Sequence, residues 1–277
     1  MCGSALNPSA PAEETWTWLS EAEGWPDRVK AMQVQDGVLE LIPGTSVWWG
    51  AFHAPFLFQT VEGDFLLRAR VRTLGLHSAF PVQPDSGSLA GLLVRAPAPA
   101  ERWSPRDERY WSLTTGLASG PGGTQPSMEI TTTVHGESGI EWFAGREGWV
   151  ELAAARLGRY VMGLHRFPNE PWTFTRDEAT LGALRAPPPG LGEERPDLPS
   201  RVQVGLTAMT NWPAVRQDYR ALAPDARPGK FNRTVVCAEG EELRAQFHQV
   251  QLTRPRVAVA SPAEWPEAAL LAALGLN

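Results

Sequence analysis

Five consecutive residues, Gly91-Leu92-Leu93-Val94-Arg95, give the clearest indication of how this chain folds. The segment Phe65 to Arg72 (FLLRARVR) precedes them and alternates between apolar and polar residues. A second apolar segment that carries a glycine, Val202 to Met209 (VQVGLTAM), follows much later. Period-two segments separated by Gly and Pro are typical of strands in a half-buried antiparallel sheet. The pattern therefore predicts an all-β sandwich of two antiparallel sheets.

Similar segments recur along most of the chain, and helical periodicity is nearly absent between them. Asp36-Gly37 separates two of these segments and predicts a β-hairpin over Met32 to Ile42, because its turn needs positive φ. Thr15 to Leu19 suits a first edge strand. Further strands are predicted at Val47 to His53, Phe56 to Thr60, Asp64 to Thr73, Leu89 to Ala96, Tyr110 to Gly116, Met128 to Val134, Glu141 to Ala144, Trp149 to Arg156, Arg159 to Arg166, Trp172 to Arg176, Val202 to Met209 and Gln246 to Thr253. So many strands indicate a jelly roll larger than an immunoglobulin-type sandwich.

The sandwich is expected to occupy residues 15–255, between a flexible N-terminal tail (1–14) and a C-terminal helical tail (256–277). Ser261-Pro262-Ala263-Glu264 has the form of a capping box and predicts a helix that continues to about Leu274, before Gly275. This helix places Leu270, Leu271 and Leu274 on one face, which we expect to pack against a sheet.

Three segments between strands, 76–88, 183–200 and 214–230, are predicted to be surface loops rather than strands. Proline in these segments removes backbone donors and stiffens the chain. Long loops at one end of a sandwich are a common location for binding groups.

Composition limits the classes of partner. The 277 residues are 43% hydrophobic and 20% charged, which is typical of a globular protein with a sizeable core. The net charge of −6 and the lack of a basic block exclude nucleic acid as an expected partner. The sequence does not indicate an oligomeric state.

No apolar segment is long enough to span a bilayer, and no signal peptide is recognisable, so the sequence as it stands predicts a cytoplasmic protein. Met1-Cys2-Gly3-Ser4 also resembles the start of a mature bacterial lipoprotein. A lipid-anchored or secreted protein is therefore the alternative, if a leader preceded Cys2. Basic residues are almost all Arg, which suggests a GC-rich bacterial source.

Four segments resemble the concanavalin A-like lectin/glucanase superfamily: Asp36 to Leu41 (DGVLEL), Ala54 to Phe65 (APFLFQTVEGDF), Ala90 to Arg95 (AGLLVR) and Val202 to Leu206 (VQVGL). The most similar branch contains bacterial domains of unknown function and the related C-terminal modules of β-xylosidases. The resemblance extends over residues 15–255 and rests on strand positions. It implies a curved jelly roll whose concave sheet often holds sugars and whose edge sometimes holds structural calcium.

Twelve tryptophans are many for this length, and indoles stack on the apolar faces of sugar rings while polar side chains bind the hydroxyls. Because adjacent residues of a strand point to opposite faces, one of Trp48 and Trp49 should lie outside the core between the sheets. The candidate binding residues are Trp48, Trp49, His53, Arg95, Trp103, Tyr110, Trp111, Glu129, His135, Glu141, Trp142, Asn211 and Trp212.

Catalytic signatures are missing from the sequence. Glucanases of the superfamily carry Glu-x-Asp-x-x-Glu on one strand, since a retaining mechanism needs two carboxyl groups about 5 Å apart. Here Glu137 and Glu141 would lie about 13 Å apart in an extended strand, and Glu129 supplies a single acid. The leading hypothesis is a non-catalytic, lectin-like carbohydrate-binding module.

Two alternatives remain open: a glycoside hydrolase or lyase with an atypical carboxylate site, and a structural or protein-interaction sandwich. The five histidines show no metal-ligand spacing, and we expect no cofactor. The isolated Asp36 and Asp64 do not support a calcium site.

Overall fold

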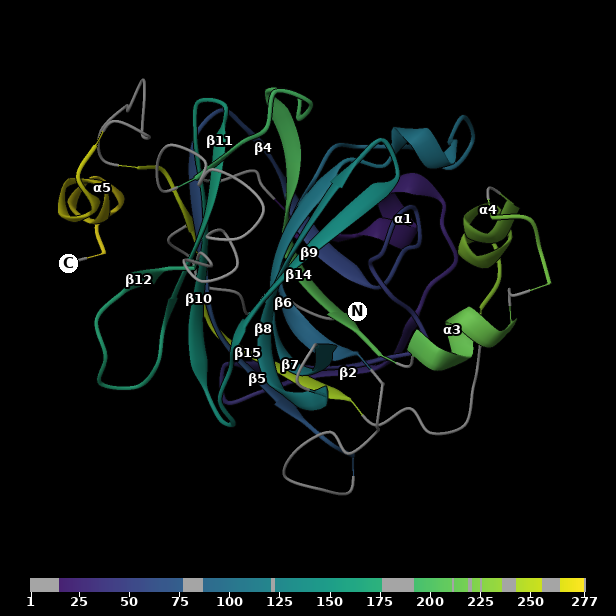
Figure 1. Ribbon diagram of the computed structural model, residues 1–277, viewed down its shortest axis with the longest axis horizontal. Coiled ribbons are helices and arrows are strands. Elements are labelled where there is room, and N and C mark those ends of the chain that lie inside the picture. The colour runs from purple at the N-terminus through teal and green to yellow at the C-terminus, as the bar shows by residue number, and fades with distance from the viewer. Residues whose placement is uncertain are drawn as a thin grey trace.

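The computed structural model describes residues 15–76, 87–120, 123–175, 192–210, 212–218, 221–224, 226–235, 243–255 and 265–276. Over these residues the chain forms two antiparallel sheets that pack face to face (Figure 1). The predicted all-β sandwich of jelly-roll type, with a short C-terminal helix, is confirmed. The expected N-terminal tail, residues 1–14, lies outside the described residues.

Seven strands form one sheet of the described chain. Their order is β1 (Thr17–Trp18), β4 (Phe56–Glu62), β14 (Arg201–Met209), β6 (Ser88–Arg95), β7 (Tyr110–Gly120), β8 (Gly123–Val134) and β9 (Glu137–Ala144). The two glycine-bearing segments that indicated the fold pair directly, with Gly205 opposite Leu93. β1 is the edge strand predicted at this position.

Eight strands of the described residues form the other sheet. The order is β12 (Thr173–Phe174), β11 (Tyr160–Arg166), β10 (Val150–Leu157), β5 (Phe65–Leu74), β15 (Arg244–Thr253), β3 (Val38–Pro43) and β2 (Val29–Gln35), and β13 (Glu193–Glu194) pairs with β11. Asp36 and Gly37 form the predicted turn between β2 and β3, with φ of 52° and 75°. The hairpin therefore forms as its turn residues require.

The core between the sheets consists of the alternate residues that the period-two pattern identified. Leu67, Ala69 and Val71 of β5 face Leu92 and Val94 of β6 across this core, and all five are buried. The intervening residues of β5 point to the other side of the sheet. Alternation in the sequence thus separates an inner from an outer face in each sheet.

Each sheet also carries a cover on part of its outer face, so the molecule has more than two layers. α1 (Leu19–Glu23), α3 (Trp212–Asp218) and α4 (Ala226–Asn232) lie on the side of the seven-stranded sheet. α5 (Glu267–Leu274) lies on the opposite side of the molecule (Figure 1). Its buried Leu270 and Leu274 pack on β10 and β11 through Ala153 and Leu164, as the leucine spacing predicted.

Several sequence-based assignments need correction. β8 and β9 begin at Gly123 and Glu137, before the predicted Met128 and Glu141, and the segment 183–200, predicted as a loop, contains β13. Residues 47–53 were expected to form a strand, but they form a loop with isolated bridges at its ends, Ser46 to Thr210 and Trp49 to Phe52. Gly50 has a φ of 58°, which breaks the extended path. The segment 214–230, predicted as a loop, contains most of α3 and α4.

The C-terminal helix ends at Leu274 as predicted, with Gly275 at a φ of 71°, but it begins at Glu267 instead of near Pro262. Pro266 explains the later start, since proline disfavours a helical conformation in the residue before it. The predicted capping box, 261–264, lies outside the described residues. No helix among those described is long and apolar enough to cross a membrane.

Gly205 provides a test of how closely the strands approach. A Cβ added there would lie 1.9 Å from the Leu57 carbonyl oxygen, so Gly205→Ala forces β14 away from β4. We expect the free energy of unfolding, measured by urea titration, to fall by about 1–3 kcal/mol. Gly139→Ala, on the exposed strand β9 with no atom within 4 Å of the added carbon, is the matched control. Equal stabilities of the two variants would contradict the close approach.

Candidate functional site

The register of the seven-stranded sheet arranges polar residues in rows across its outer face, the face that does not pack on the second sheet. One row contains Gln203, Arg95, Tyr110, Thr133 and Ser138; the next contains Gly205, Leu93, Ser112, Thr131 and Ile140; the third contains Thr207, Gly91, Thr114, Glu129 and Trp142. Two groups of these residues differ in chemistry. One surrounds Arg95 and the other surrounds Glu129.

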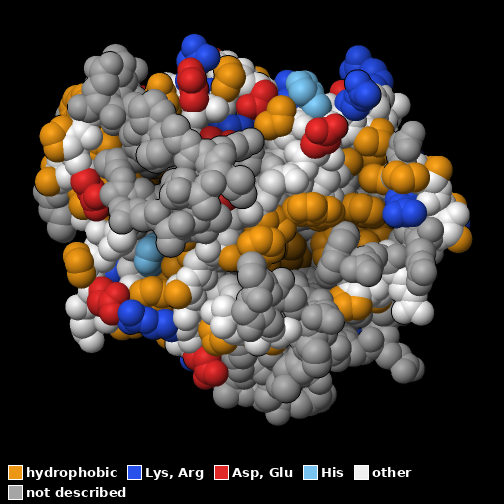
Figure 2. All heavy atoms as spheres, viewed as in Figure 1, with side chains coloured by type: hydrophobic (Ala, Val, Ile, Leu, Met, Phe, Trp, Pro, Cys, Tyr) orange, Lys and Arg blue, Asp and Glu red, His pale blue; other side chains and the backbone are white. Residues whose placement is uncertain are grey.

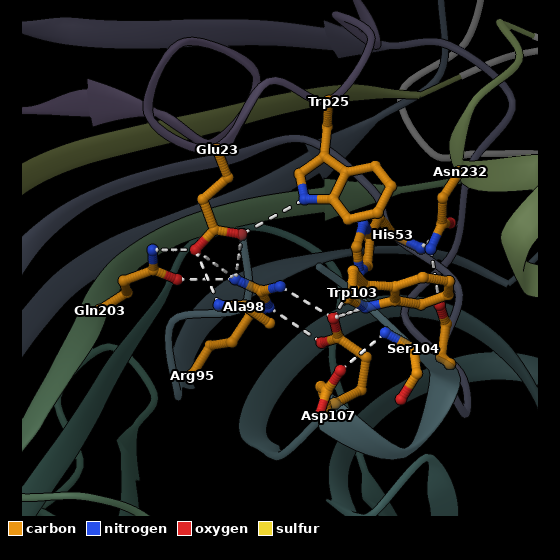
Figure 3. A network of polar contacts seen from close by, with 12 residues as sticks. Glu23, Trp25, His53, Arg95, Ala98, Trp103, Ser104, Asp107, Gln203 and Asn232 are labelled. Atoms are coloured by element: carbon orange, nitrogen blue, oxygen red, sulfur yellow. Dashed lines mark hydrogen bonds and ion pairs between the residues drawn. The ribbon is translucent and has the colours of Figure 1, made fainter. Parts of the chain in front are cut away.

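Arg95 is fully buried at the end of β6 and is the centre of a polar network (Figure 3). Its Nε and Nη2 donate to the two oxygens of Glu108 at 2.9 and 2.8 Å, a bidentate pair. Its Nη1 donates to both oxygens of Glu23, at 3.0 and 2.9 Å, and to Oε1 of Gln203 at 2.8 Å. One guanidinium therefore joins α1, β6, β14 and the segment before β7.

Glu108 binds two further side chains besides Arg95. Its Oε1 accepts the indole N–H of Trp103 at 2.6 Å and lies 2.7 Å from Nε2 of His53. Because an ionised carboxylate can only accept, Nε2 of His53 carries the proton and donates it. The other ring nitrogen, Nδ1, is buried without a hydrogen-bond partner among the described residues. A small pocket beside His53, lined in part by Trp25, has room for about one water molecule.

The charge of Arg95 sets the ionisation of the network. Burial alone would raise the pKa of Glu108, but Arg95 and the hydrogen bonds of His53 outweigh it and hold the pKa well below its usual range. Burial alone would lower the pKa of Arg95, yet Glu108 and Glu23 raise it above its usual range. Burial lowers the pKa of His53 and favours its neutral form. The network is therefore an ion pair that stays charged throughout the normal pH range.

Local structure holds each member of the network in place. The 3₁₀ helix Pro105–Asp107 (η1) begins after Ser104, whose backbone N–H donates to Asp107 at 2.6 Å, and Glu108 follows immediately. Asn232 at the end of α4 accepts from the His53 backbone at 3.0 Å and donates to the Ala51 carbonyl at 2.8 Å. The loop that contains His53 is thus fastened to the helical cover.

Glu129 on β8 has a different environment on the same outer face. Its side chain is buried, and no cation among the described residues forms an ion pair with it. Thr131 donates to its Oε1 at 2.9 Å, and the Trp142 side chain also hydrogen-bonds to it. Burial raises the pKa of Glu129 to about 7, and these hydrogen bonds offset only part of the effect. The carboxyl group therefore changes its charge near neutral pH.

The surroundings of Glu129 are rich in hydroxyl groups. Thr114, Ser112 and Thr131 are all buried on the same face, and Oγ of Ser112 has no hydrogen-bond partner among the described residues. Trp142 lies directly opposite Glu129 on the edge strand β9 and is 39% exposed. This group joins an accessible indole to a buried carboxyl group.

Figure 2 shows a band of hydrophobic side chains across the surface between the strands around β9 and the helices α3 and α4. Trp49 and Phe52, which pack on the outer hydrophobic cluster of this sheet, are only partly buried. The Gly50 backbone N–H donates to Oγ of Ser138 at 2.6 Å and connects this loop to β9. The accessible part of the outer face therefore has an apolar border.

The structure places the predicted binding residues in several environments. Trp48, His53, Arg95, Trp103 and Tyr110 lie on the outer side of the sheet but are buried there. Trp111 is buried in the core between the sheets. The indoles of Trp48, Trp103 and Trp111 therefore have no exposed face for a ligand, because each is packed by neighbours.

The remaining predicted residues divide differently. Trp142 and Glu129 form the pair described above, whereas Glu141 is exposed and points to the opposite face of β9, since it alternates with Trp142. His135 is exposed in the turn between β8 and β9. Asn211 lies outside the described residues, and the side chain of Trp212 is not described. Trp48 and Trp49 both lie outside the core between the sheets.

Several members of the two groups were not predicted. Glu23, Glu108 and Gln203 gave no local signal, although a lone Arg at the end of an apolar strand requires a carboxylate partner if it is buried. Alternation in Glu129-Ile130-Thr131, with the polar residues on one face, was a usable signal for Thr131. The hydroxyls of Ser112 and Thr114 follow the same rule on β7.

No group of three or more His, Cys, Asp or Glu side chains converges in the described part of the chain. Glu129 and Glu141 do not form a catalytic pair, because β9 carries Glu141 on its other face. The two carboxylates of the network, Glu23 and Glu108, are already paired with Arg95.

The sequence matches no model of a known protein family and no curated protein. A protein of unknown function from Saccharomyces cerevisiae has a similar structure, with a TM-score of 0.51 and 15% identity over 87% of this chain and 96% of that one. The GH43 protein BlXynB from Bacillus licheniformis has a TM-score of 0.43 and 11% identity. The match covers 79% of this chain and only 33% of that protein. A β-1,3-glucanase from Mycobacterium marinum has a TM-score of 0.40 and 11% identity, over 88% of this chain and 93% of that one.

The similarity to the yeast protein shows that the fold is shared over nearly the whole of that chain, and it shows the fold alone. A jelly-roll sandwich of this kind agrees with the concanavalin A-like architecture. Membership of that superfamily, and of the particular branch, stays a prediction.

The Arg95 network can be tested by removing one charge. Glu108→Gln leaves a buried guanidinium without its bidentate partner, so we expect the free energy of unfolding to fall by about 3–5 kcal/mol. Glu194→Gln is the control, since it removes an exposed carboxylate that pairs with Arg159 at 2.8 Å, and it should cost no more than about 1 kcal/mol. Urea unfolding at pH 7 measures both. Similar losses in the two variants would show that Arg95 does not depend on Glu108.

Proposed function

We propose that this protein binds a saccharide, without cleaving it, on the outer face of its seven-stranded sheet at Trp142 and Glu129. One observation carries the proposal: a 39% exposed indole lies opposite a buried carboxyl group that has no cation partner among the described residues. The residues of this saccharide site are Trp142, Glu129, Thr131, Thr114 and Ser112.

The two parts of the site suit the two chemical surfaces of a sugar ring. The apolar C–H face of a ring packs on an indole, and Trp142 presents one that is already accessible. The indole is also oriented, because its side chain hydrogen-bonds to Glu129. An oriented aromatic side chain loses little conformational freedom on binding, which favours affinity.

The hydroxyl groups of the sugar need hydrogen-bonding partners. Glu129 has further acceptor capacity, since a carboxylate offers about four lone-pair positions and the described contacts use only some of them. The buried Oγ of Ser112, without a partner among the described residues, supplies a further group of this kind. A buried polar atom without a partner costs stability, and a ligand hydroxyl would remove that cost.

A hydrolase or lyase is the second candidate, and the raised pKa of Glu129 is the observation that favours it. A carboxyl group that titrates near 7 suits general acid–base chemistry. The usual glycosidase mechanism needs a second carboxyl group on the same face, however, and Glu141 points away from it. Release of reducing sugar from a polysaccharide panel, lost in Glu129→Gln, would support this candidate over simple binding.

Trp142→Ala tests the stacking surface. Loss of the indole should weaken retention on a polysaccharide, identified first on a glycan array, by at least about 10-fold, equivalent to about 1.4 kcal/mol. The melting temperature should change little, because the side chain is partly exposed on an edge strand. Affinity gel electrophoresis measures the retention.

Met32→Ala is the matched control for Trp142→Ala. Met32 is 40% exposed on β2, the edge strand of the other sheet, so its loss removes a similar apolar surface away from the site. We expect its retention to equal that of the wild type. A Trp142→Ala protein that melts normally and binds as the wild type does would exclude this site.

Glu129 predicts the pH dependence of binding. Sugar hydroxyls donate more strongly to an ionised carboxylate, so the affinity should rise as the pH increases through about 7. Each pKa unit by which the ligand lowers the pKa of Glu129 adds about a factor of 10 to the affinity at high pH. Isothermal titration calorimetry between pH 5.5 and 8.5 measures this, and Glu129→Gln should abolish the rise.

Stability provides an independent check on Glu129. Its pKa is raised above the usual 4.5, so the folded state holds the proton more tightly than the unfolded state. The stability from this group is complete below pH 4.5 and is lost as the pH rises through about 7. Glu129→Gln should therefore be more stable than the wild type at pH 8.5. A less stable variant at that pH would contradict the assigned environment.

A further inference from the structure

Three arginines form a row on the outer face of the other sheet. Arg68, Arg70 and Arg72 alternate along β5 with Ala69 and Val71 of the core, so their side chains leave the sheet on the same side. All three are partly exposed. Successive members of such a row lie about 7 Å apart, which gives the row a length of about 13 Å. We call these three residues the β5 arginine row.

No arginine of the β5 arginine row forms an ion pair within 4 Å among the described residues, although the charge of Glu151 acts on Arg68. Arg68 donates to Oε1 of Gln251 at 2.5 Å, and Arg72 donates twice to Oε1 of Gln246, at 3.0 and 2.6 Å. Both partners are neutral amides. The guanidinium of Arg70 makes no hydrogen bond or ion pair with the described residues. Glu151 lies opposite Arg70 in the register, but its carboxylate pairs with Arg166 at 2.7 Å.

Four described arginines outside this row pair with a carboxylate at 2.6 to 2.8 Å. Arg146 pairs with Glu170, Arg159 with Glu194 and Arg166 with Glu151, and the buried Arg195 pairs with Asp197. The chain has 31 acidic and 25 basic residues, so carboxylates are not scarce. Around β5, Glu151 pairs with Arg166 and Glu40 lies 3.8 Å from Arg244, so the three arginines of the row leave a local excess of positive charge on an acidic protein.

A partly exposed indole brings these charges together. The Cζ atoms of Arg70 and Arg72 lie 5.3 and 4.7 Å from the ring centre of Trp149, and the ring of His248 lies 6.2 Å away. Two cations on one ring repel each other, and the attraction of each for the indole offsets part of that cost. An anion bound between the two guanidinium groups would offset it further. Trp149 thus lies beside two guanidinium groups, of which Arg70 has all its donors free of described hydrogen bonds and Arg72 donates through Nε and Nη2 to Gln246.

We propose that the β5 arginine row, with Trp149, binds an acidic polysaccharide whose sugars carry carboxylate groups. Arginine forks match carboxylates in a planar, two-bond geometry, and a row of three suits a linear chain with repeated charges. The amides of Gln246 and Gln251, opposite Arg72 and Arg68 in the register, lie where the hydroxyls between those charges need neutral partners. This surface is on the opposite side of the sandwich from the saccharide site and does not depend on it.

A nucleic acid fits the row less well. Its affinity for proteins comes from neutralising many phosphates, which requires a dense basic surface. Here only three cations stand next to Glu151 and Glu40, and Glu40 itself lies 3.8 Å from Arg244, on a chain of net charge −6. A polysaccharide with one carboxylate per sugar has a lower charge and more hydroxyls, in keeping with this mixture.

Polygalacturonate is the probe that tests the proposal, with dextran as the uncharged polysaccharide and duplex DNA as the competing polyanion. The wild type should bind polygalacturonate in calorimetry at low salt, bind it less tightly as salt is added, and not bind dextran through this surface. The double variant Arg70→Gln, Arg72→Gln should weaken the binding by at least about 10-fold. Trp142→Ala, which removes the saccharide site, should leave it unchanged.

The control removes the same charge elsewhere. The double variant Arg146→Gln, Arg159→Gln replaces two exposed arginines that are paired with carboxylates. It should bind polygalacturonate as the wild type does. The single variant Arg70→Gln separates a loss of binding from a loss of folding, because this side chain makes no hydrogen bond with the described residues. It should weaken binding and leave the melting temperature unchanged. No binding to polygalacturonate, equal losses in both double variants, or tighter binding to DNA would each overturn the proposal.

Discussion

A buried positive charge is the constraint on which the outer face of the seven-stranded sheet depends. Arg95 ends an otherwise apolar strand, and a guanidinium without water costs several kcal/mol unless carboxylates and hydrogen bonds replace the solvent. Its partners lie 72, 13 and 108 positions away in the sequence, at Glu23, Glu108 and Gln203. The segments that contain them must converge for the chain to fold. The position of the cover is thus set by electrostatics as well as by its apolar contacts.

The same face gives two carboxyl groups opposite properties. Both Glu108 and Glu129 are buried, and burial alone raises the pKa of each. Arg95 reverses the effect at Glu108, whereas Glu129 has only the neutral donors of Thr131 and Trp142. Groups whose environments separate their pKa values in this way commonly have separate roles. Glu108 holds the cover in place, and the group around Glu129 has the features of a ligand site.

The sandwich could be predicted because its signal is local. Residues of a strand alternate between its two faces whatever the strand pairs with, so the strands around Leu92, Val71 and Val204 were recognisable from the sequence pattern alone. The segment 47–53 has strand-like composition and still forms a loop, since Gly50 adopts a positive φ and Trp48 donates to Thr207 at 2.7 Å. Tertiary contacts overrode the local preference there.

The site was harder to predict than the fold, because alternation identifies two faces without showing what covers them. Trp48 and Trp142 both lie on the outer side of the seven-stranded sheet. Trp48 is buried under the helices and loops that cover this side, whereas Trp142 is partly exposed. The difference depends on α1, α4 and the loop between β3 and β4, which come from distant parts of the sequence. The partners of Arg95 could not be predicted from the sequence for the same reason.

Arg95 and Arg70 show how burial decides what an arginine can do. Arg95 has lost its water, so it must be saturated by its own chain and has no capacity for a ligand. Arg70 keeps part of its water, which lets the fold tolerate it without a carboxylate partner in the described residues. Replacing that water by an oxyanion needs no rearrangement of an existing ion pair. Partial exposure on a rigid strand therefore makes Arg70 the more suitable of the two for recognition.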